Sequence, residues 1–307
     1  MLKSLLFFNL MPICFLVLAF LIDKVIRNHI RFRRKLNGRA KYSMKQILLI
    51  LMFFFVSPGA LLALDISGSL GGIALIRPVY EGSKEYEVDP LPMLDIPIGK
   101  FGFLDSDRGL GIYLLKHRSL EFGGSLGYYE SREEADSDKL IGLGQIDDGI
   151  DGRMFANLIL GHYSLSFQIR NDLSSNHDGT LFDVGASYTF KPLPFADWKF
   201  KMGMTYADEN YMQTYFGVTQ EQVNRSGLIT AGVPFVAKAG WKDISLDSNL
   251  SVELGRHWHS KLLFGYKRLI KDAAFSPLVK ELGSADQYHF GIGLAYKFSG
   301  RTFKFLR

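Results

Sequence analysis

The chain has 307 residues with a formal net charge of +5, and 47% of its residues are hydrophobic, including 25 Phe and 14 Tyr. Nine of the 36 basic residues and only one acidic residue lie in residues 1–43, which leaves 27 basic and 30 acidic residues in the rest of the chain. The mildly acidic body argues against a nucleic-acid-binding protein. The only cysteine, Cys14, lies in the leader, so the body can form neither disulfides nor thiol chemistry.

Two long apolar segments open the chain, at residues 4–22 and 47–64. A basic start at Met44 and Lys45, an apolar middle and small residues ending at Ala63 predict a signal peptide over residues 44–63. On this interpretation Met44 is the true start, and residues 1–43 are either an upstream segment that is not translated or an unusual extension. The alternative is a membrane anchor at residues 4–22, followed by a basic flank.

The body after residue 64 consists of segments of about ten residues in which apolar and polar side chains alternate. This period of two is typical of strands with one apolar and one polar face. We predict strands at 66–78, 89–98, 100–105, 109–116, 119–130, 149–160, 162–170, 180–190, 198–206, 236–254, 258–269 and 287–298.

The alternation alone does not say which face points into a core. In residues 163–170, Tyr, Leu, Phe and Ile alternate with Ser, Ser, Gln and Arg. The apolar faces of the body are rich in Phe, Tyr, Trp and Met, and buried tyrosines need polar partners that a sandwich core rarely offers. Aromatic residues near strand ends suit the two membrane interfaces instead. We therefore predict that the apolar faces contact lipid and that the polar faces line a lumen.

The connections between these segments alternate between short and long. Short ones are Gly99, 117–118, Gly161, 191–197 and 255–257, and longer ones include 79–88, 131–148, 171–179, 207–235 and 270–286. Outer-membrane barrels have short periplasmic turns and longer external loops. The prediction is a transmembrane antiparallel up-and-down β-barrel of twelve strands over residues 64–298, with both ends in the periplasm and a tail at 299–307. Ten strands remain if the pair 100–105 and 109–116 is absent.

The loops contain few combinations of residues that suggest chemistry. "DDGIDG" (147–152) lacks the ligands of a calcium-binding loop, since Gly149 and Leu158 occupy the third and twelfth positions. The histidines of "RHWHS" have no third ligand nearby, and Trp258 between them suits a membrane interface. We interpret His177-Asp178, Asp208-Glu209 and the charge run 131–138 as solvated loop residues. We predict no enzyme, no cofactor and no metal site.

Several of these stretches resemble the MltA-interacting protein (MipA)/OmpV family. They are "YEGSKEYEVDPLPMLDI" (80–96), "RGLGIYLL" (108–115), "GQIDDGIDG" (144–152), "YADENYMQTYFGVTQEQVNRSGL" (206–228) and "DAAFSPLVKELGSADQYHFGIGLAYKF" (272–298). They occur in the family's order and cover residues 66–298. The aromatic end of the last segment also resembles the terminal assembly signal of outer-membrane proteins, although nine residues follow Phe298.

The resemblance implies an outer-membrane barrel in contact with lipid and lipopolysaccharide. It implies a scaffold that brings together a periplasmic lytic transglycosylase, which degrades murein, and a murein-synthesising penicillin-binding protein. The family provides no agreed catalytic or ligand residues. The alternative function is a narrow porin-like channel for small solutes or antibiotics. Its lumen would be lined by Glu121, Arg170, Asp183, Lys199 and Lys201.

Overall fold

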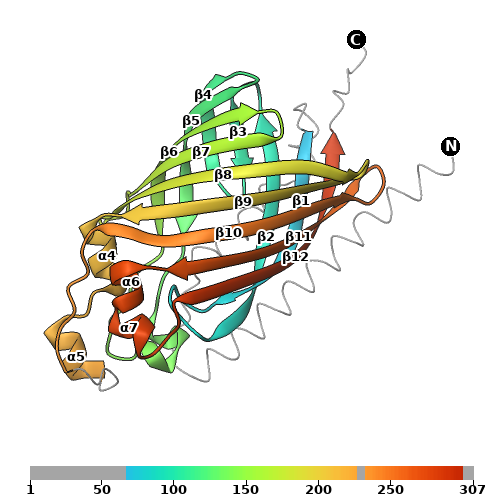
Figure 1. Ribbon diagram of the computed structural model, residues 1–307. Coiled ribbons are helices and arrows are strands. Elements are labelled where there is room, and N and C mark those ends of the chain that lie inside the picture. Colours follow the sequence, from blue (N-terminus) through green and yellow to red (C-terminus); the bar gives the residue numbers. More distant parts are fainter. Residues whose placement is uncertain (1–66, 227–231, 300–307) are drawn as a thin grey trace, which may run out of the picture. The chain divides into compact units, whose positions relative to one another are not determined.

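The computed structural model describes residues 67–226 and 232–299, and the predicted leader, signal peptide and all but the first residue of the tail lie outside these ranges. The described chain forms a closed barrel in which every strand pairs with its neighbours in an antiparallel up-and-down order (Figure 1). The strands are β1 (Ser67–Pro78), β2 (Tyr86–Ile98), β3 (Gly102–Asp105), β4 (Gly109–Lys116), β5 (Leu120–Tyr129), β6 (Gly149–Leu160), β7 (Tyr163–Asp172), β8 (Thr180–Leu193), β9 (Ala196–Ala207), β10 (Gly240–Glu253), β11 (Trp258–Leu269) and β12 (Asp286–Ser299).

The prediction of a twelve-strand barrel is confirmed, including the short pair β3 and β4. Most predicted boundaries lie within three residues of the observed ones, with the largest shift at the start of β10, which begins at Gly240. The connection predicted at 191–197 is shorter, because β8 and β9 extend toward each other and leave only Pro194 and Phe195 between them. Among the described residues, no helix is long and apolar enough to cross a membrane.

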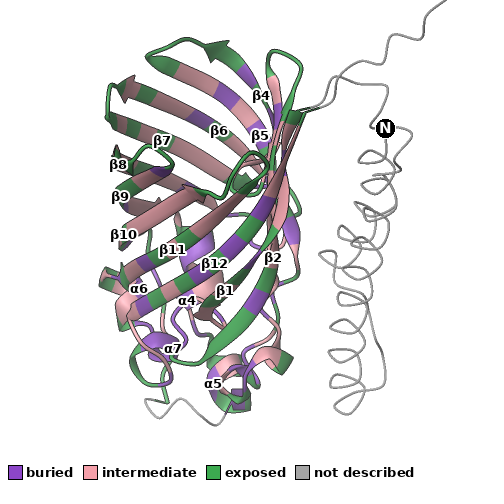
Figure 2. Cartoon of the chain, turned by 90° about the vertical axis from the view of Figure 1, so that its right-hand side faces the viewer, coloured by how far each residue is buried: buried purple, intermediate pink, exposed green. Residues whose placement is uncertain are grey.

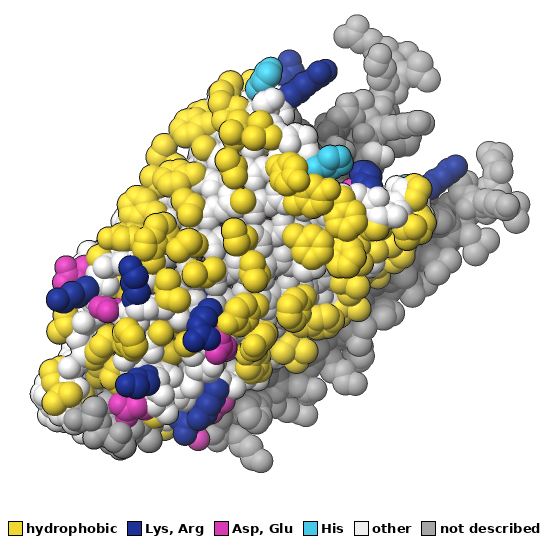
Figure 3. Space-filling view, in the orientation of Figure 1, with side chains coloured by type: hydrophobic (Ala, Val, Ile, Leu, Met, Phe, Trp, Pro, Cys, Tyr) yellow, Lys and Arg dark blue, Asp and Glu magenta, His cyan; other side chains and the backbone are white. Residues whose placement is uncertain are grey.

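The exposed apolar side chains of the strands form the outer face of the barrel. On β7, Tyr163, Leu165 and Phe167 are 62%, 51% and 43% exposed. Hydrophobic side chains cover most of the wall in the space-filling view (Figure 3). An apolar surface of this extent needs an apolar solvent, and a closed barrel leaves few backbone groups unpaired in lipid. The prediction that this face of β7 contacts lipid therefore agrees with the fold.

Aromatic side chains lie in pairs near both ends of neighbouring strands. At the end with the short turns, Trp258 on β11 contacts Tyr296 on β12 with ring centroids 5.2 Å apart. At the other end of the same two strands, Tyr266 and Tyr288 lie 5.1 Å apart. Rings at these two levels suit the two interfaces of a bilayer, where an aromatic ring contacts both lipid and water.

The long connections all lie at one end, and three of them contain short helices that we did not predict. These are α4 (Glu209–Phe216), α5 (Gln220–Ser226), α6 (Lys271–Phe275), α7 (Pro277–Lys280) and two 3₁₀ turns, η1 (Glu134–Asp136) and η2 (Asp138–Leu140). Asp208 caps α4 by accepting a hydrogen bond from the Tyr211 N–H at 2.9 Å. Such short helices are marginal on their own, so their packing stabilises them.

The expectation of a solvated charge run at 131–138 is wrong for Arg132. This residue is 8% exposed, and its guanidinium donates a hydrogen bond to the Tyr215 carbonyl at 2.8 Å. His177, also predicted to be solvated, is 9% exposed and packs against Tyr129, Tyr211 and Tyr215. Both residues are buried by loops that are distant in the sequence, which a local charge pattern does not reveal.

The two faces of β7 can be tested with one charge placed on each. Phe167→Arg puts a cation on the lipid face, and we expect it to lower the free energy of unfolding in vesicles by about 2–4 kcal/mol. Gln168→Arg puts the same cation on the inner face and should cost much less, since water and polar groups lie there. Urea unfolding followed by heat-modifiable gel migration measures both. Equal losses would contradict the assignment of faces.

Candidate functional site

The end of the barrel that carries the long connections is covered by a folded cap, which we define as residues 79–85, 130–148, 208–226, 232–239 and 270–285. Buried residues gather around its helices (Figure 2). One apolar cluster joins the α4 residues Met212 and Phe216 to Leu269 and Val279. A second joins Tyr80, Leu140, Val218 and Leu278, one from each of four connections. The connections therefore pack on one another over the mouth of the barrel.

Hydrogen bonds fasten the same connections together. The Ser276 hydroxyl donates to the Phe216 carbonyl at 2.6 Å, and the Lys238 N–H donates to the Asp272 carboxylate at 2.9 Å. The Gln222 side-chain amide donates to the Leu143 carbonyl at 2.5 Å. A cap held by apolar contacts and hydrogen bonds has a defined structure, unlike a set of free loops.

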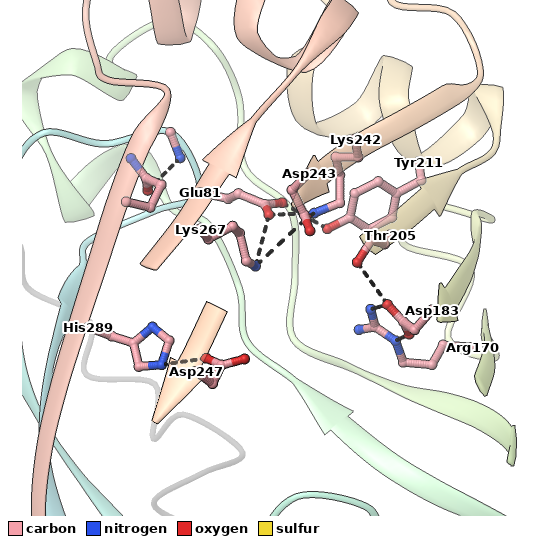
Figure 4. A network of polar contacts seen from close by, with 12 residues as sticks. Glu81, Arg170, Asp183, Thr205, Tyr211, Lys242, Asp243, Asp247, Lys267 and His289 are labelled. Carbon is pink, nitrogen blue, oxygen red and sulfur yellow. Dashed lines mark hydrogen bonds and ion pairs between the residues drawn. The ribbon is translucent and has the colours of Figure 1, made fainter. Parts of the chain in front are cut away.

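A charged network anchors the cap to the barrel wall (Figure 4). Glu81, between β1 and β2, accepts hydrogen bonds from Lys242 Nζ at 2.5 Å and from the Tyr211 hydroxyl at 3.1 Å. Lys242 Nζ also lies 2.7 Å from Asp243 Oδ2, and Lys267 Nζ lies 3.4 Å from Glu81 Oε1. The register of β10 against β9 shifts between Trp241 and Asp243, which is why neighbouring residues can both join the network.

The network keeps Glu81 ionised. Burial alone would raise the pKa of this carboxyl, but the ammonium groups of Lys242 and Lys267 and the hydrogen bonds from Lys242 and Tyr211 lower it to about 2. Burial and the nearby Glu81 carboxylate raise the pKa of the Tyr211 hydroxyl, so it stays a donor. Lys242 is 3% exposed, and the carboxylates of Glu81 and Asp243 keep its ammonium group charged.

Two of the residues predicted to line the lumen form an ion pair. Arg170 on β7 donates to Asp183 on β8 through Nε at 2.7 Å and Nη2 at 3.0 Å. The Thr205 hydroxyl donates to the same carboxylate at 2.9 Å. Arg170 also borders a small cavity of about 50 Å³ that Tyr129, Asp172, His177 and Tyr211 line beneath the cap. The polar groups of Arg170, Asp183 and Thr205 pair with one another, which indicates a structural role for them.

The other three predicted residues lie further from the cap. Glu121 on β5 accepts a weak hydrogen bond from Asn157 at 3.4 Å. Lys199 and Lys201 on β9 are exposed, and their neighbours Phe200 and Met202 are exposed on the opposite, outer face. Within the described ranges, neither lysine forms an ion pair. Their part in a conducting path stays a prediction.

The network at Glu81 was not predicted from the sequence. Its residues are far apart in the chain, and no short motif joins them. The single usable signal was the pair Lys242-Asp243, two charges in succession at the start of a strand whose faces otherwise alternate. In the part of the chain that the structure describes, no three His, Cys, Asp or Glu side chains are grouped so as to hold a metal ion.

A closed up-and-down barrel with an apolar outer wall, two levels of aromatic residues and one capped end defines an outer-membrane β-barrel protein. Residues 70–298 match the family described as MltA-interacting protein MipA, which covers almost the whole barrel. The chain therefore belongs to the MltA-interacting protein MipA family, and it is located in the outer membrane, as the resemblance implied.

Comparison with curated proteins finds no match. Among solved structures, the NanC porin is similar with a TM-score of 0.37 and 6% identity, over 76% of this chain and 100% of that one. OmpT of Vibrio cholerae has a TM-score of 0.36 and 8% identity over 76% and 97% of the two chains. The COG4313 outer-membrane channel of Pseudomonas putida F1 has a TM-score of 0.34 and 11% identity, over 79% of this chain and 100% of that one. These likenesses are too weak to carry an argument about function.

We expect Glu81→Gln to loosen the cap, because it leaves Lys242 with one anion instead of two. Removing one partner of a buried ion pair costs about 3–5 kcal/mol, and the remaining Asp243 should reduce the loss to about 2 kcal/mol. The network lowers the pKa of Glu81 from 4.5 to about 2. The stabilisation of the cap by the ionised carboxylate is therefore complete above pH 4.5 and is lost as the pH falls toward 2. Hydrogen exchange of the α4 amides as a function of pH measures both effects.

The matched control is Glu253→Gln, which breaks the ion pair with Lys297 at the other end of the barrel. Both partners of that pair are 42% exposed, so the loss should stay below about 1 kcal/mol. The network hypothesis is wrong if α4 exchanges equally in wild type and Glu81→Gln, or if Glu81→Gln keeps the acid-dependent step.

Proposed function

We propose that this protein is a membrane-embedded scaffold that holds a lytic transglycosylase and a penicillin-binding protein at the inner face of the outer membrane. Membership of the MltA-interacting protein MipA family is the observation that carries the proposal. The cap adds support, because loops that are packed over the mouth argue against a wide pore. A scaffold also needs none of the nucleophiles or metal ligands of an enzyme.

The periplasmic turns are the surface available to such partners. Short turns face the periplasm in outer-membrane barrels, and here they carry Lys100, Arg118 and Arg256. All three are exposed, and within the described ranges none has an ion-pair partner. The acidic residues Asp197 and Glu253 near the same end are paired with Lys191 and Lys297. The turns therefore favour a partner with an acidic docking surface.

Charge reversal at these turns tests the scaffold. We expect detergent-solubilised wild type from a native host to retain both murein enzymes, and we expect Arg118→Glu with Arg256→Glu to retain severalfold less of each. Crosslinking followed by quantitative mass spectrometry measures the retained enzymes. Lys280→Glu, an exposed cation on α7 at the capped end, is the control and should retain them as wild type does. Absence of both enzymes from wild type would refute the proposal.

A second candidate function is a narrow channel, which the exposed lysines Lys199 and Lys201 favour. Unpaired cations on the inner wall attract anions, so such a channel should prefer anions to cations. Planar-bilayer recording distinguishes the two functions. Stable anion-selective steps that weaken in Lys199→Gln with Lys201→Gln would favour the channel, and a silent bilayer would favour the scaffold.

A further inference from the structure

Part of one edge of β2 has no paired strand among the described residues. This strand runs from Tyr86 to Ile98, but it pairs with β3 only from Asp95 onward, because β3 and β4 form a short hairpin with its tip at residues 106–108. In the described chain, no strand pairs with this edge of β2 from Tyr86 to Leu94. An ion pair between Arg77 and Glu130 joins β1 to the end of β5 at the capped side. We call the unpaired stretch of the β2 edge between this ion pair and the hairpin tip the lateral notch.

The sequence of β2 adapts this edge to remain unpaired. The Leu94 N–H donates to the Ser106 hydroxyl at 2.7 Å, and that hydroxyl donates to the Pro92 carbonyl at 2.9 Å, so both groups face the notch. Residues two apart on a strand face the same edge, so Pro90 and Pro92 direct their nitrogens there too. Because proline has no N–H, two donors that lipid could not satisfy are missing. The same prolines disfavour an added strand.

The inner wall next to the notch is apolar in its middle and charged toward the cap, where Arg77 on β1 lies 2.8 Å from the inward Asp89 on β2. Ile73 and Leu75 on β1 alternate with the outward residues Ala74 and Ile76, and Ile73 is only 8% exposed. A Cβ atom on Gly291 would lie 2.9 Å from Ile73 Cδ1, and one on Gly293 would lie 2.3 Å from Met93 Sδ. These glycines of β12 therefore make room for apolar side chains inside the barrel. We call Ile73, Leu75, Leu91 and Met93 the inner apolar strip.

An aromatic cluster extends the strip along the same side of the lumen. Phe103 on β3, Tyr113 on β4 and Phe155 on β6 have ring centroids 4.9–5.8 Å apart and are at most 8% exposed. The Arg108 guanidinium lies over the Phe103 ring at 4.2 Å and also donates to Asp105 at 2.6 Å. The aromatic cluster therefore lies beside the hairpin that borders the notch, and Arg108 at the hairpin tip is a cation paired with the Asp105 carboxylate.

The opposite side of the lumen carries more cations than anions, and the inward carboxylate of β10 that lies opposite Lys201 in the strand register is Asp247. β9, with the exposed Lys199 and Lys201, is six strands from β3 in the order around the twelve-strand barrel. Lys261 on β11 adds a third inward ammonium group, since its neighbour Leu262 is exposed on the outer face. An apolar strip facing a surface with more cations than anions matches a ligand with an acyl chain and an anionic head.

We propose that the lumen binds the acyl chain of an anionic amphiphile, which enters from the membrane through the lateral notch. The chain lies on the inner apolar strip and the head group points to Lys199 and Lys201. The notch is continuous with the lipid-facing wall, where Val88 is 66% and Leu110 53% exposed. Between the Arg77–Glu130 ion pair and Arg108, the outward side chains of β2 and the inner apolar strip offer an acyl chain apolar contacts on both faces of the wall. A fatty acid and an anionic phospholipid share this chemistry.

Photolabelling in vesicles tests the proposal with the barrel intact. The probes are a diazirine-bearing palmitate and a phosphatidylglycerol with the same group in one chain. Mass spectrometry then locates the label. We expect it on the inward residues Ile73, Leu75, Leu91 and Met93 as well as on outward neighbours such as Ile76 and Leu94. Label on outward residues only, with both probes, would overturn the proposal. The probe that labels the inward residues identifies the source of the chain.

Two pairs of variants separate binding from folding. Leu91→Gln should lower inward labelling about tenfold, since it removes apolar contact from the chain. Leu94→Gln, the same change on the outer face, should leave inward labelling near wild type. Lys199→Gln with Lys201→Gln should remove any preference for palmitate over a diazirine-bearing palmityl alcohol, whereas the turn variant Lys191→Gln should keep it. Heat-modifiable migration shows that each variant is folded. Equal labelling in folded Leu91→Gln and Leu94→Gln would refute the inner site.

Discussion

Backbone hydrogen bonding in lipid is the constraint on which the rest of this structure depends. A bilayer offers no donors or acceptors, so strands that cross it must pair with neighbours until the sheet closes. Closure explains the antiparallel order from β1 to β12 and the side-chain alternation on every strand. It also explains the local exception. Where β2 loses its partner above the short hairpin, Pro90 and Pro92 lack the N–H groups that would otherwise lie unpaired.

The closed barrel has two ends with different designs. At one end the connections are short, and exposed cations such as Arg118 and Arg256 lie on the turns. At the other end the connections form a cap with its own apolar clusters and a buried charged network around Glu81 and Lys242. The charged side chains inside the barrel also differ between the two ends. Arg170 and Asp183 pair near the cap, whereas Lys199 and Lys201 are exposed further from the cap. A scaffold would use the turns, and a ligand would use the lumen.

The fold could be predicted closely from the sequence, and the site could not. Alternation located all twelve strands, even the pair β3 and β4, because side-chain direction repeats every two residues. The predictions for Arg132 and His177 were wrong because the burial of a loop residue depends on contacts between distant parts of the chain. Each is buried by partners from other connections, such as Tyr215 and Tyr211, and polar loop residues look alike whether solvated or packed.

The sequence by itself determined the class of protein, the number of strands, the face of each strand that contacts lipid and the family to which the chain belongs. These properties depend on residues that are neighbours or nearly so, and a period of two is visible without knowing any contact. Only the tertiary structure decided which charges pair, that the loops form a cap and that one edge of β2 forms the lateral notch. Glu81 and Lys242 are 161 residues apart, and closing the barrel is what brings them within 2.5 Å.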